Sequence, residues 1–262
     1  MDESKGAIYI ASGEEHIKRA RKSAKSLKKK NDIDVSLLTP DEDVSSEYFD
    51  RIKKIDREIN QKGDSLLTEK DIIYDKNLYL DSDTFVNSEI SDVFQLLDRF
   101  EIAMAFNEAR AWYHEEFYEN KNIEIPEAFP EYNSGVIAFR DTKKVRKLFK
   151  DWGNTYEEFE YSRNQPALRK VLFESKVNLG AIPPEYNFMT NTVGFASGDV
   201  KILHQGNSEV DLKLCSELLN EVEGKKVTTW EYEPFKVVPN SYKPFLNYKN
   251  KLKQLIRYFN GL

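Results

Sequence analysis

Short apolar segments alternate with amphipathic segments along most of this chain, and this alternation limits the folds that it can adopt. The apolar, strand-like runs lie at residues 6–10, 33–38, 78–80, 102–106, 136–139, 177–182 and 200–203. Helical spacing of apolar residues predicts helices between several of these runs. Strands that alternate with helices favour an α/β fold, in which helices cover both faces of a mostly parallel sheet.

Two of the predicted helices carry distinct local signals. Ser12 precedes Glu15 at the spacing of a capping box, which predicts the start of the first helix. The apolar residues of the second recur at helical spacing, at Phe49, Ile52, Ile55 and Ile59. A third helix is predicted around residues 90–97. These segments are the ones that would cover the sheet.

The strand predicted at 78–80 leads directly into two carboxylates, Asp81 and Asp83. Side chains in a strand alternate between faces, so an extended backbone would point both carboxylates the same way. In parallel sheets, ligands bind beyond the carboxyl ends of the strands, which is where these residues lie. Two convergent carboxylates suit a hard divalent cation, and such a cation can hold a diphosphate leaving group. The pattern therefore indicates a nucleotide-sugar transferase.

Spacing tests the other interpretations of this segment. Asp and Ser also occur together in simple turns, where they bond to nearby backbone. A haloacid-dehalogenase-type phosphatase has Asp-x-Asp-x-Thr, but position 85 is Phe and the threonine is Thr84. An EF-hand loop that starts at Asp81 needs Gly at its sixth place and Glu at its twelfth, which hold Val86 and Asp92. The interpretation as a simple turn therefore stays open, whereas the phosphatase and EF-hand interpretations fail.

The composition fits a single large α/β domain, or such a domain with an appendage. The chain has 262 residues and a net charge of −6, a mildly acidic balance that does not favour nucleic-acid binding. Cys215 is the only cysteine, which rules out an intrachain disulfide and favours a reducing compartment. The charged N-terminus has no apolar region behind it, and no stretch is long and apolar enough to span a membrane. We therefore expect a cytoplasmic protein.

Four segments carry motifs that can be compared with known families. They are Leu78-Tyr79-Leu80-Asp81-Ser82-Asp83, Tyr132-Asn133-Ser134-Gly135-Val136, Asn164-Gln165-Pro166-Ala167-Leu168 and Ile202-Leu203-His204. In this order they resemble the GT-A-fold glycosyltransferases, and among them the glycogenin-like enzymes of glycosyltransferase family 8. The second segment is similar to the family's sugar-pocket segment, the third to its Asp-Gln segment and the fourth to a strand that ends in a metal-binding His. The likeness implies a GT-A fold over roughly residues 5–207.

The resemblance also implies a role for each segment. Asp81, Asp83 and His204 would hold one divalent cation, Mn²⁺ or Mg²⁺, because two carboxylates and an imidazole suit such an ion. The expected contacts of the nucleotide diphosphate sugar are Ala11, Ser12, Asp81, Ser82, Asp83, Asn133, Ser134 and Gly135. Gln165 and Asn164 are expected at the catalytic centre. The acceptor would be a glycan, a lipid or a protein, and the resemblance implies retention of the anomeric configuration.

Each of these residues also has a purely structural interpretation. His204 would be a hydrogen-bonded core residue at the end of an apolar strand, although its family position favours a metal ligand. Residues 133–135 would be a turn that leads into a strand. Gln165 would be a polar residue at a helix start, and Ser12 only a helix cap.

Two departures from the family pattern keep a second function open. Asn164 stands where the family usually has an Asp, and a neutral amide is neither a base nor a strong charge partner. After His204 the chain reads Gln205-Gly206-Asn207-Ser208, whereas the family often has a Lys-Pro-Trp that holds the diphosphate. The leading hypothesis is a metal-dependent glycosyltransferase. The alternative is a non-catalytic protein that binds a nucleotide sugar or a carbohydrate. A nucleotidyltransferase would need a Gly-rich basic loop after the first strand, and residues 11–15 do not provide one.

Two further segments have open interpretations. Residues 107–131 are long, polar and aromatic, which fits either an acceptor-binding lid or a small packed helix. We expect a GT-A-like domain over residues 1–224 and a C-terminal extension over 225–262. Within the extension, residues 241–262 are basic and place Leu252, Leu255, Ile256 and Phe259 on one helical face. This helix would either pack on the domain or associate weakly with an anionic membrane surface at the inner membrane face.

Overall fold

The structure is a computed structural model that describes residues 3–45, 47–57, 59, 66–107, 124–158, 164–190, 195–196, 198–204, 227–228 and 238–239. The strands are β1 (Lys5–Ile10), β2 (Asp34–Thr39), β3 (Arg51–Lys54), β4 (Lys76–Leu80), β5 (Thr84–Val86), β6 (Ile102–Phe106), β7 (Tyr132–Arg140), β8 (Leu179–Ala181), β9 (Phe188–Met189), β10 (Phe195–Ala196), β11 (Ile202–His204), β12 (Val227–Thr228) and β13 (Val238–Pro239). The helices are α1 (Glu14–Lys28), α2 (Val93–Leu96), α4 (Lys143–Glu158), α5 (Gln165–Glu174) and the 3₁₀ turn η1 (Pro184–Tyr186).

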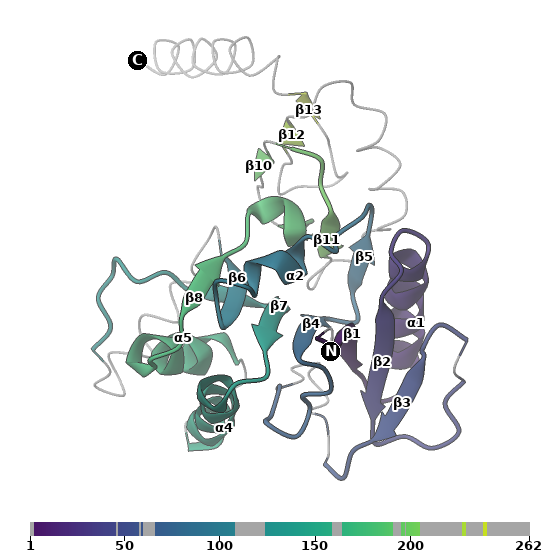
Figure 1. Ribbon diagram of the computed structural model, residues 1–262, viewed down its shortest axis with the longest axis horizontal. Helices are drawn as coiled ribbons and strands as arrows, with labels where there is room; N and C mark the ends of the chain where they lie inside the picture. The colour runs from purple at the N-terminus through teal and green to yellow at the C-terminus, as the bar shows by residue number, and fades with distance from the viewer. Residues whose placement is uncertain are drawn as a thin grey trace, which may run out of the picture.

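A central sheet of seven strands organises the described residues, in the order β3-β2-β1-β4-β7-β6-β8 (Figure 1). The strands pair in parallel except at β7, which is antiparallel to both of its neighbours, β4 and β6. Two small sheets accompany it, β5-β11-β9 and β10-β12-β13. The mostly parallel sheet predicted from the sequence is confirmed. The small sheet β5-β11-β9 places His204 near the carboxyl end of β4.

The core lies in two layers, one on each face of the central sheet, because neighbouring strand residues point to opposite faces. In β1, Ala7 and Tyr9 join one layer and Ile8 and Ile10 join the other. Helices α1 and α2 supply the first layer with residues such as Ala20, Ala24, Leu27 and Phe94. Helices α4 and α5, which lie together and away from α1 in Figure 1, supply the second with residues such as Phe149, Trp152 and Leu168. The α/β fold with helices on both faces is therefore the observed one.

The helix predicted over residues 49–59 is wrong, since the structure forms the edge strand β3 there. β3 pairs in parallel with β2, and Ile52, opposite Leu37, is 37% exposed. Phe49 and Ile55 are both buried, but in the layers on opposite faces of the sheet. A single helical face could not reach both layers, whereas a chain that runs along the sheet edge can. The basic residues of β3 suit an edge strand, because charges there discourage pairing with other chains.

The capping box predicted at Ser12 and Glu15 is also wrong. Helix α1 begins at Glu14 after Gly13, and no side chain caps its first turn. The Ser12 hydroxyl instead donates to Asp41 Oδ1, at 2.9 Å, and the Gly13 backbone N–H donates to Asp41 Oδ2, at 2.7 Å. Asp41 therefore ties the loop after β1 to the loop after β2, and this tie replaces the cap.

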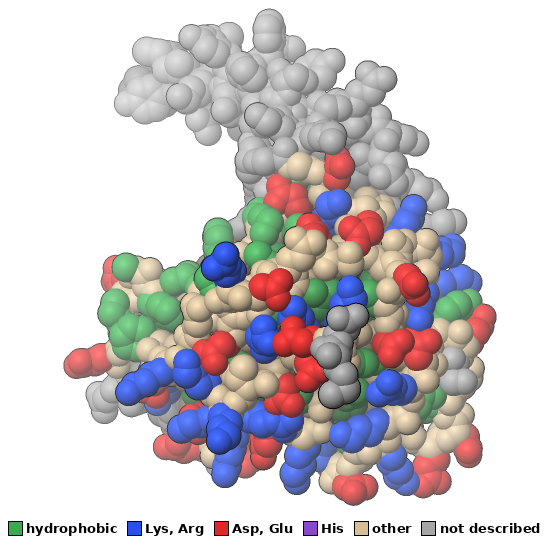
Figure 2. All heavy atoms as spheres, in the orientation of Figure 1, with side chains coloured by type: hydrophobic (Ala, Val, Ile, Leu, Met, Phe, Trp, Pro, Cys, Tyr) green, Lys and Arg blue, Asp and Glu red, His purple; other side chains and the backbone are tan. Residues whose placement is uncertain are grey.

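Several predictions lie outside the described residues. They concern most of the loop at 107–131, the residues after His204 that replace the Lys-Pro-Trp, and the basic helix at 241–262. The boundary between residues 224 and 225 stays a prediction, although β12 lies beyond it and pairs with β10, which lies before it. In the described part of the chain, no helix is both long and apolar enough to cross a membrane. On the face drawn in Figure 2, basic and acidic side chains of the described residues are interspersed, so neither charge dominates that face.

Candidate metal and donor site

A turn between β4 and β5 brings Asp81 and Asp83 together. The backbone N–H of Asp81 donates to the Gly135 carbonyl of β7, at 2.8 Å. The Thr84 backbone N–H and hydroxyl both donate to the Asp81 carbonyl, at 3.2 and 2.8 Å. The sequence argument for convergence assumed an extended backbone, but the strand ends at Leu80. The carboxylates converge because the turn closes on itself.

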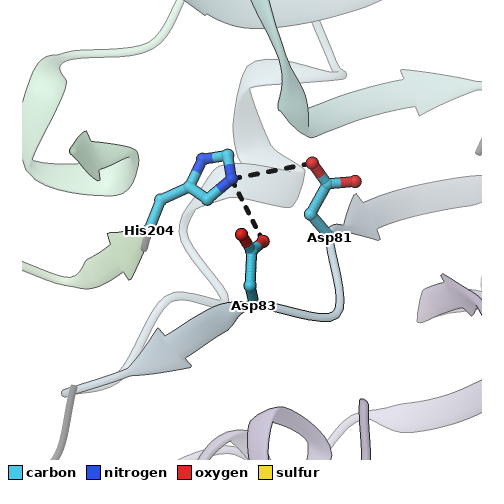
Figure 3. A group of neighbouring side chains, drawn as sticks. All are labelled: Asp81, Asp83 and His204. Atoms are coloured by element: carbon cyan, nitrogen blue, oxygen red, sulfur yellow. Dashed lines mark ion pairs between the residues drawn. The ribbon is translucent and has the colours of Figure 1, made fainter. Parts of the chain in front are cut away.

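Strand β11 places His204 beside this turn. β11 pairs antiparallel with β5, with His204 opposite Thr84. The His204 Nε2 atom lies 3.2 Å from Asp83 Oδ1 and 3.6 Å from Asp81 Oδ2, and Figure 3 shows the ring edge directed at both carboxylates. One ligand atom from each residue fits within 4.8 Å of the others. The structure thus gathers the three predicted metal ligands from distant parts of the sequence.

The charges of the cluster reinforce one another when no cation is bound. Burial on its own lowers the pKa of His204, but the adjacent Asp83 and Asp81 carboxylates outweigh it, so the His204 pKa is raised above its ordinary value. Burial likewise raises the pKa of Asp83, and the His204 imidazole outweighs it and lowers the Asp83 pKa. A proton on the His204 imidazole therefore supplies the positive charge that a bound cation would otherwise supply.

Asp81 and His204 are each oriented by a second buried residue that the sequence argument did not identify. The Tyr79 hydroxyl donates to Asp81 Oδ1, at 2.5 Å, which leaves Oδ2 directed at His204. Asn187 Oδ1 lies 2.8 Å from His204 Nδ1. Tyr79 could have been identified from its place in the apolar run before Asp81, but no motif marks Asn187.

Gly135 provides the space in which the cluster sits. A Cβ atom at this position would lie 2.1 Å from His204 Cε1 and 2.8 Å from Asp81 Oδ2. The Gly135 N–H donates to the Asn133 side-chain oxygen, at 2.9 Å, which fixes the backbone there. The requirement for glycine at this point of the predicted sugar-pocket segment is therefore one of space.

Asn133 and Gln165 meet through a shared partner, Asn107. The Asn107 side-chain NH₂ donates to Gln165 Oε1, at 3.2 Å, and to the buried Glu131 Oε1, at 2.6 Å. The Asn133 NH₂ donates to Asn107 Oδ1, at 3.1 Å. Asn107 and Glu131 were not singled out as site residues, although they are the first and last residues of the polar segment 107–131. The structure thus places the two predicted sugar-contacting amides in one network.

Asn164 has structural partners. Its side-chain oxygen accepts a hydrogen bond from the Ser134 hydroxyl, at 3.0 Å, and its backbone carbonyl accepts one from Trp152 Nε1, also at 3.0 Å. Asn164 and Ser134 are both buried, and Asn164 directly precedes α5, where a helix start was expected. These contacts join β7, α4 and α5 behind the network of amides.

The remaining predicted residues lie at the carboxyl ends of β1 and β4. Ala11 is buried and its backbone N–H donates to Leu38 O, at 3.2 Å, whereas Ser12 is held by Asp41. Ser82 lies in the turn between Asp81 and Asp83. All three therefore lie at the edge of the sheet where α/β proteins bind ligands.

The three clustered side chains fit a divalent cation. Ligands about 2.1 Å from an octahedral ion lie about 3 Å apart, and the distances from His204 Nε2 to the two carboxylates are 3.2 and 3.6 Å. Two carboxylates and one imidazole suit Mn²⁺, which accepts both ligand types and keeps positions open for other oxygens. The space that Gly135 keeps clear lies against this same cluster.

A mostly parallel sheet with an Asp-x-Asp turn and a strand-terminal histidine at its carboxyl edge is the arrangement that the resemblance to GT-A sugar transferases implied. The family model described as glycosyl transferase family 8 matches residues 66–209, and the chain belongs to that family. It is accordingly a glycosyltransferase of GT-A fold. Comparison with curated protein sequences gives no match.

Solved structures share this fold. The bifunctional glycosyltransferase WbbM has 12% sequence identity and a TM-score of 0.57, over 79% of this chain and 46% of that one. The galactosyltransferase LgtC, solved with donor and acceptor sugar analogues, has 16% identity and a TM-score of 0.56, over 91% of this chain and 99% of LgtC. Mouse xyloside xylosyltransferase 1 has 14% identity and a TM-score of 0.54, over 79% of this chain and 100% of that one. At such identities the likeness concerns the fold alone, and this chain spans less than half of WbbM.

Proposed function

We propose that this protein transfers a sugar from a nucleotide diphosphate sugar to an acceptor hydroxyl, with a divalent cation held by Asp81, Asp83 and His204. The observation that carries the proposal is the clustering of these three side chains, whose ligand atoms all lie within 4.8 Å of one another. When bound, the cation would neutralise the diphosphate and stabilise it as a leaving group. Mn²⁺ is the ion that best fits the donor set.

The other predicted residues would bind and orient the donor. Ser82 and the segment 133–135 adjoin the cation ligands, so we assign them to the diphosphate and the sugar. Gln165 and Asn133, joined through Asn107, have amide groups suited to sugar hydroxyls. Asn164 would support this group indirectly, because it is buried against Ser134. Ala11 and Ser12 would receive the nucleoside beyond β1.

Family membership supports the remaining parts of the proposal. We assign retention of the anomeric configuration from the resemblance to family 8, and place the transferase within residues 1–224. The acceptor is a glycan, a lipid or a protein. LgtC and the mouse xylosyltransferase act, by their names, on different sugars, so the donor sugar of this chain needs its own measurement.

The deciding experiment compares Asp83→Asn with Asp32→Asn. Asp83 lies in the cluster, whereas Asp32 is exposed just before β2, at the opposite end of the strands. A thermal-shift panel of nucleotide sugars with Mn²⁺ first identifies the donor, because a ligand of the folded state raises its stability. Calorimetry then measures Mn²⁺-dependent binding of the matching nucleoside diphosphate. We expect Asp83→Asn to weaken it by well over tenfold (about 1.4 kcal/mol per tenfold) and Asp32→Asn to leave it unchanged.

Two outcomes would contradict the proposal. If Asp83→Asn binds Mn²⁺ and the nucleoside diphosphate as tightly as the parent, the metal assignment is wrong. If the parent binds the donor with Mn²⁺ but neither hydrolyses nor transfers the sugar to any acceptor offered, the non-catalytic alternative replaces transfer.

A further inference from the structure

Asn187 makes a contact with the candidate metal ligand His204 that no motif explains. Its side-chain oxygen lies 2.8 Å from His204 Nδ1, and the two residues are 5% and 4% exposed. The other ring nitrogen, Nε2, is the one that faces Asp81 and Asp83. The imidazole is therefore held from both sides, by an amide at one nitrogen and by carboxylates at the other.

The chemistry of this contact selects one form of the ring. A neutral imidazole carries its hydrogen on either nitrogen, and the nitrogen without it has the lone pair that can bind a metal. An amide oxygen can only accept a hydrogen bond, so this contact requires a hydrogen on Nδ1. In a ring that has lost its second hydrogen, the lone pair then lies on Nε2, the atom directed at the carboxylates. The carboxylates are acceptors too and draw a hydrogen to Nε2 when no cation is bound, so Asn187 has to hold the Nδ1 hydrogen against them. A metal ligand needs this tautomer here.

The backbone around Asn187 keeps its side chain in place. Asn187 ends the 3₁₀ turn η1, where its N–H donates to the Pro184 carbonyl, at 3.0 Å. The next two residues form β9, which pairs in parallel with β11 and brings Met189 opposite His204. The Thr190 N–H donates to the His204 carbonyl, at 2.9 Å. Both the backbone and the ring of His204 are therefore bonded to the short segment 187–190.

We propose that Asn187 is a positioning residue that holds His204 in the tautomer with hydrogen on Nδ1 and a free lone pair on Nε2. The role in metal binding rests on the proposed function, whereas the hydrogen on Nδ1 follows from the contact with Asn187 alone. Outer hydrogen-bond partners of metal-bound histidines fix the tautomer and the ring orientation, and their loss costs about 10- to 100-fold in metal affinity. We expect Asn187→Ala to weaken Mn²⁺ binding by this factor.

The first measurement is ¹⁵N NMR of the histidine rings in metal-free protein, above the pH at which the imidazoles titrate. The chain has three histidines, and His204→Gln assigns the His204 signals. We expect Nε2 of the parent to show the lone-pair signal and Nδ1 the N–H signal. Asn187→Ala should shift the hydrogen towards Nε2, where the carboxylates accept it, whereas Asn187→Asp, which keeps an acceptor oxygen, should restore the parental pattern. Calorimetric titration with Mn²⁺ alone should follow the same order.

Asn77→Ala is the matched control. Asn77 is also a buried asparagine, but its side chain bonds to Ile73 and Tyr74 near the start of β4, away from the cluster. We expect the His204 tautomer and the Mn²⁺ affinity to stay at parental values. Equal loss in Asn187→Ala and Asn77→Ala would show a general effect of lost packing and overturn the proposal.

The outcomes separate this inference from the proposed function. If the parent carries hydrogen on His204 Nε2, the inference is wrong, and this measurement holds even if Asn187→Ala does not fold. If Asp83→Asn abolishes Mn²⁺ binding but Asn187→Ala changes neither the His204 tautomer nor the Mn²⁺ affinity, the metal assignment is correct and the proposed role of Asn187 is wrong. If the parent binds no Mn²⁺, the proposed function fails, and the NMR result alone decides what Asn187 does to the ring.

Discussion

Gly135 decides how much room remains between His204 and Asp81. Its backbone lies at the start of β7, and its carbonyl accepts the hydrogen bond that anchors the Asp81 backbone. Any side chain at this position would meet the His204 ring and the Asp81 carboxylate, which are the groups that face the cation site. Because the ring is buried and bonded to Asn187, it cannot swing away cheaply.

We predict that Gly135→Ala disrupts the metal centre more than it disrupts the fold. The added methyl group would have to displace the ring or the carboxylate from a cluster whose atoms lie within 4.8 Å. Overpacking of this kind costs about 1–3 kcal/mol. Mn²⁺ affinity, measured by calorimetry, should fall by about tenfold or more, on the order of the loss for a misplaced ligand.

Gly153→Ala is the control for this prediction. Gly153 lies inside α4, where an added Cβ atom would have no neighbour within 4 Å, and alanine suits a helix better than glycine. We expect Gly153→Ala to raise stability by about 0.5–1 kcal/mol and to leave Mn²⁺ affinity unchanged. Parental Mn²⁺ affinity in Gly135→Ala would mean that the cluster tolerates a side chain and that the steric argument is wrong.

A chain of buried hydroxyls connects helix α1 to the turn that carries the two carboxylates. The Tyr9 hydroxyl lies 2.9 Å from the Ser23 hydroxyl, which lies 2.7 Å from Thr84 Oγ1. Thr84 in turn donates to the Asp81 carbonyl. Thr84 also begins β5, the strand that pairs with β11 and so positions His204. One residue therefore links α1, the turn and the strand that holds the histidine.

We predict that Thr84→Val lowers both the free energy of unfolding and the affinity of the candidate site for Mn²⁺. The change keeps the shape of the side chain but leaves the Ser23 hydroxyl and the Asp81 carbonyl without this partner. Loss of a buried hydrogen-bond partner costs about 1–3 kcal/mol. Denaturant unfolding should show that loss, and Mn²⁺ titration should show weaker binding because the turn is no longer fixed.

Thr142→Val separates the two effects. The Thr142 hydroxyl accepts a hydrogen bond from the Val145 N–H at the start of α4, away from the cluster. Its removal should cost about 1 kcal/mol, as for other helix caps, without a change in Mn²⁺ affinity. If Thr84→Val behaves like Thr142→Val, the hydroxyl chain stabilises the fold but does not position the site.

The elements that the sequence predicted well are those whose local pattern and tertiary packing agree. The runs that became β1, β2, β4 and β6 are short, mainly apolar segments, which is the pattern expected of strands buried on both faces of a sheet. The segment 49–59 was predicted wrongly because its apolar spacing also suits a chain that passes from one face of a sheet edge to the other. Local spacing cannot show that the free edge of β2 will offer backbone partners.

The same limit applies to the candidate site. The ligand residues belong to short motifs and could be identified by resemblance. Asn187, Asn107 and Glu131 could not, because each acts through a contact made by distant segments in the fold. Even the convergence of Asp81 and Asp83 was expected for the wrong reason, since a turn closed by Thr84 produces it.

The candidate metal site joins segments that are distant in the sequence. Asp81 and Asp83 lie between β4 and β5, and His204 ends β11 in a small sheet. An ion that binds all three side chains only in the folded state stabilises the molecule as a unit. At a concentration of 100 times its dissociation constant, the gain is about 2.7 kcal/mol. For a domain of this size that gain corresponds to a rise of roughly 5–10 °C in Tm.

We predict that this rise in Tm grows with pH. The raised pKa of His204 means that the protonated ring, paired with Asp83 and Asp81, stabilises the metal-free protein. That contribution is fully present below the unfolded histidine pKa of about 6.5 and is lost as the pH rises through the folded value. The lowered pKa of Asp83 acts in the other direction, and its contribution is lost only in acid, as the pH falls through the folded value. Mn²⁺ must displace the His204 proton, so its affinity should rise by up to about tenfold per pH unit until the ring is neutral.

Thermal unfolding with and without Mn²⁺, at about pH 6 and about pH 8, measures this effect. The Mn²⁺-induced shift should be small at the lower pH and clearly larger at the higher one. His204→Gln keeps a polar side chain but has no proton to release, so its remaining shift should vary much less with pH over this range. An equal shift at both pH values in the parent, or the same pH dependence in His204→Gln, would mean that the His204 proton and the metal ion do not compete for one site.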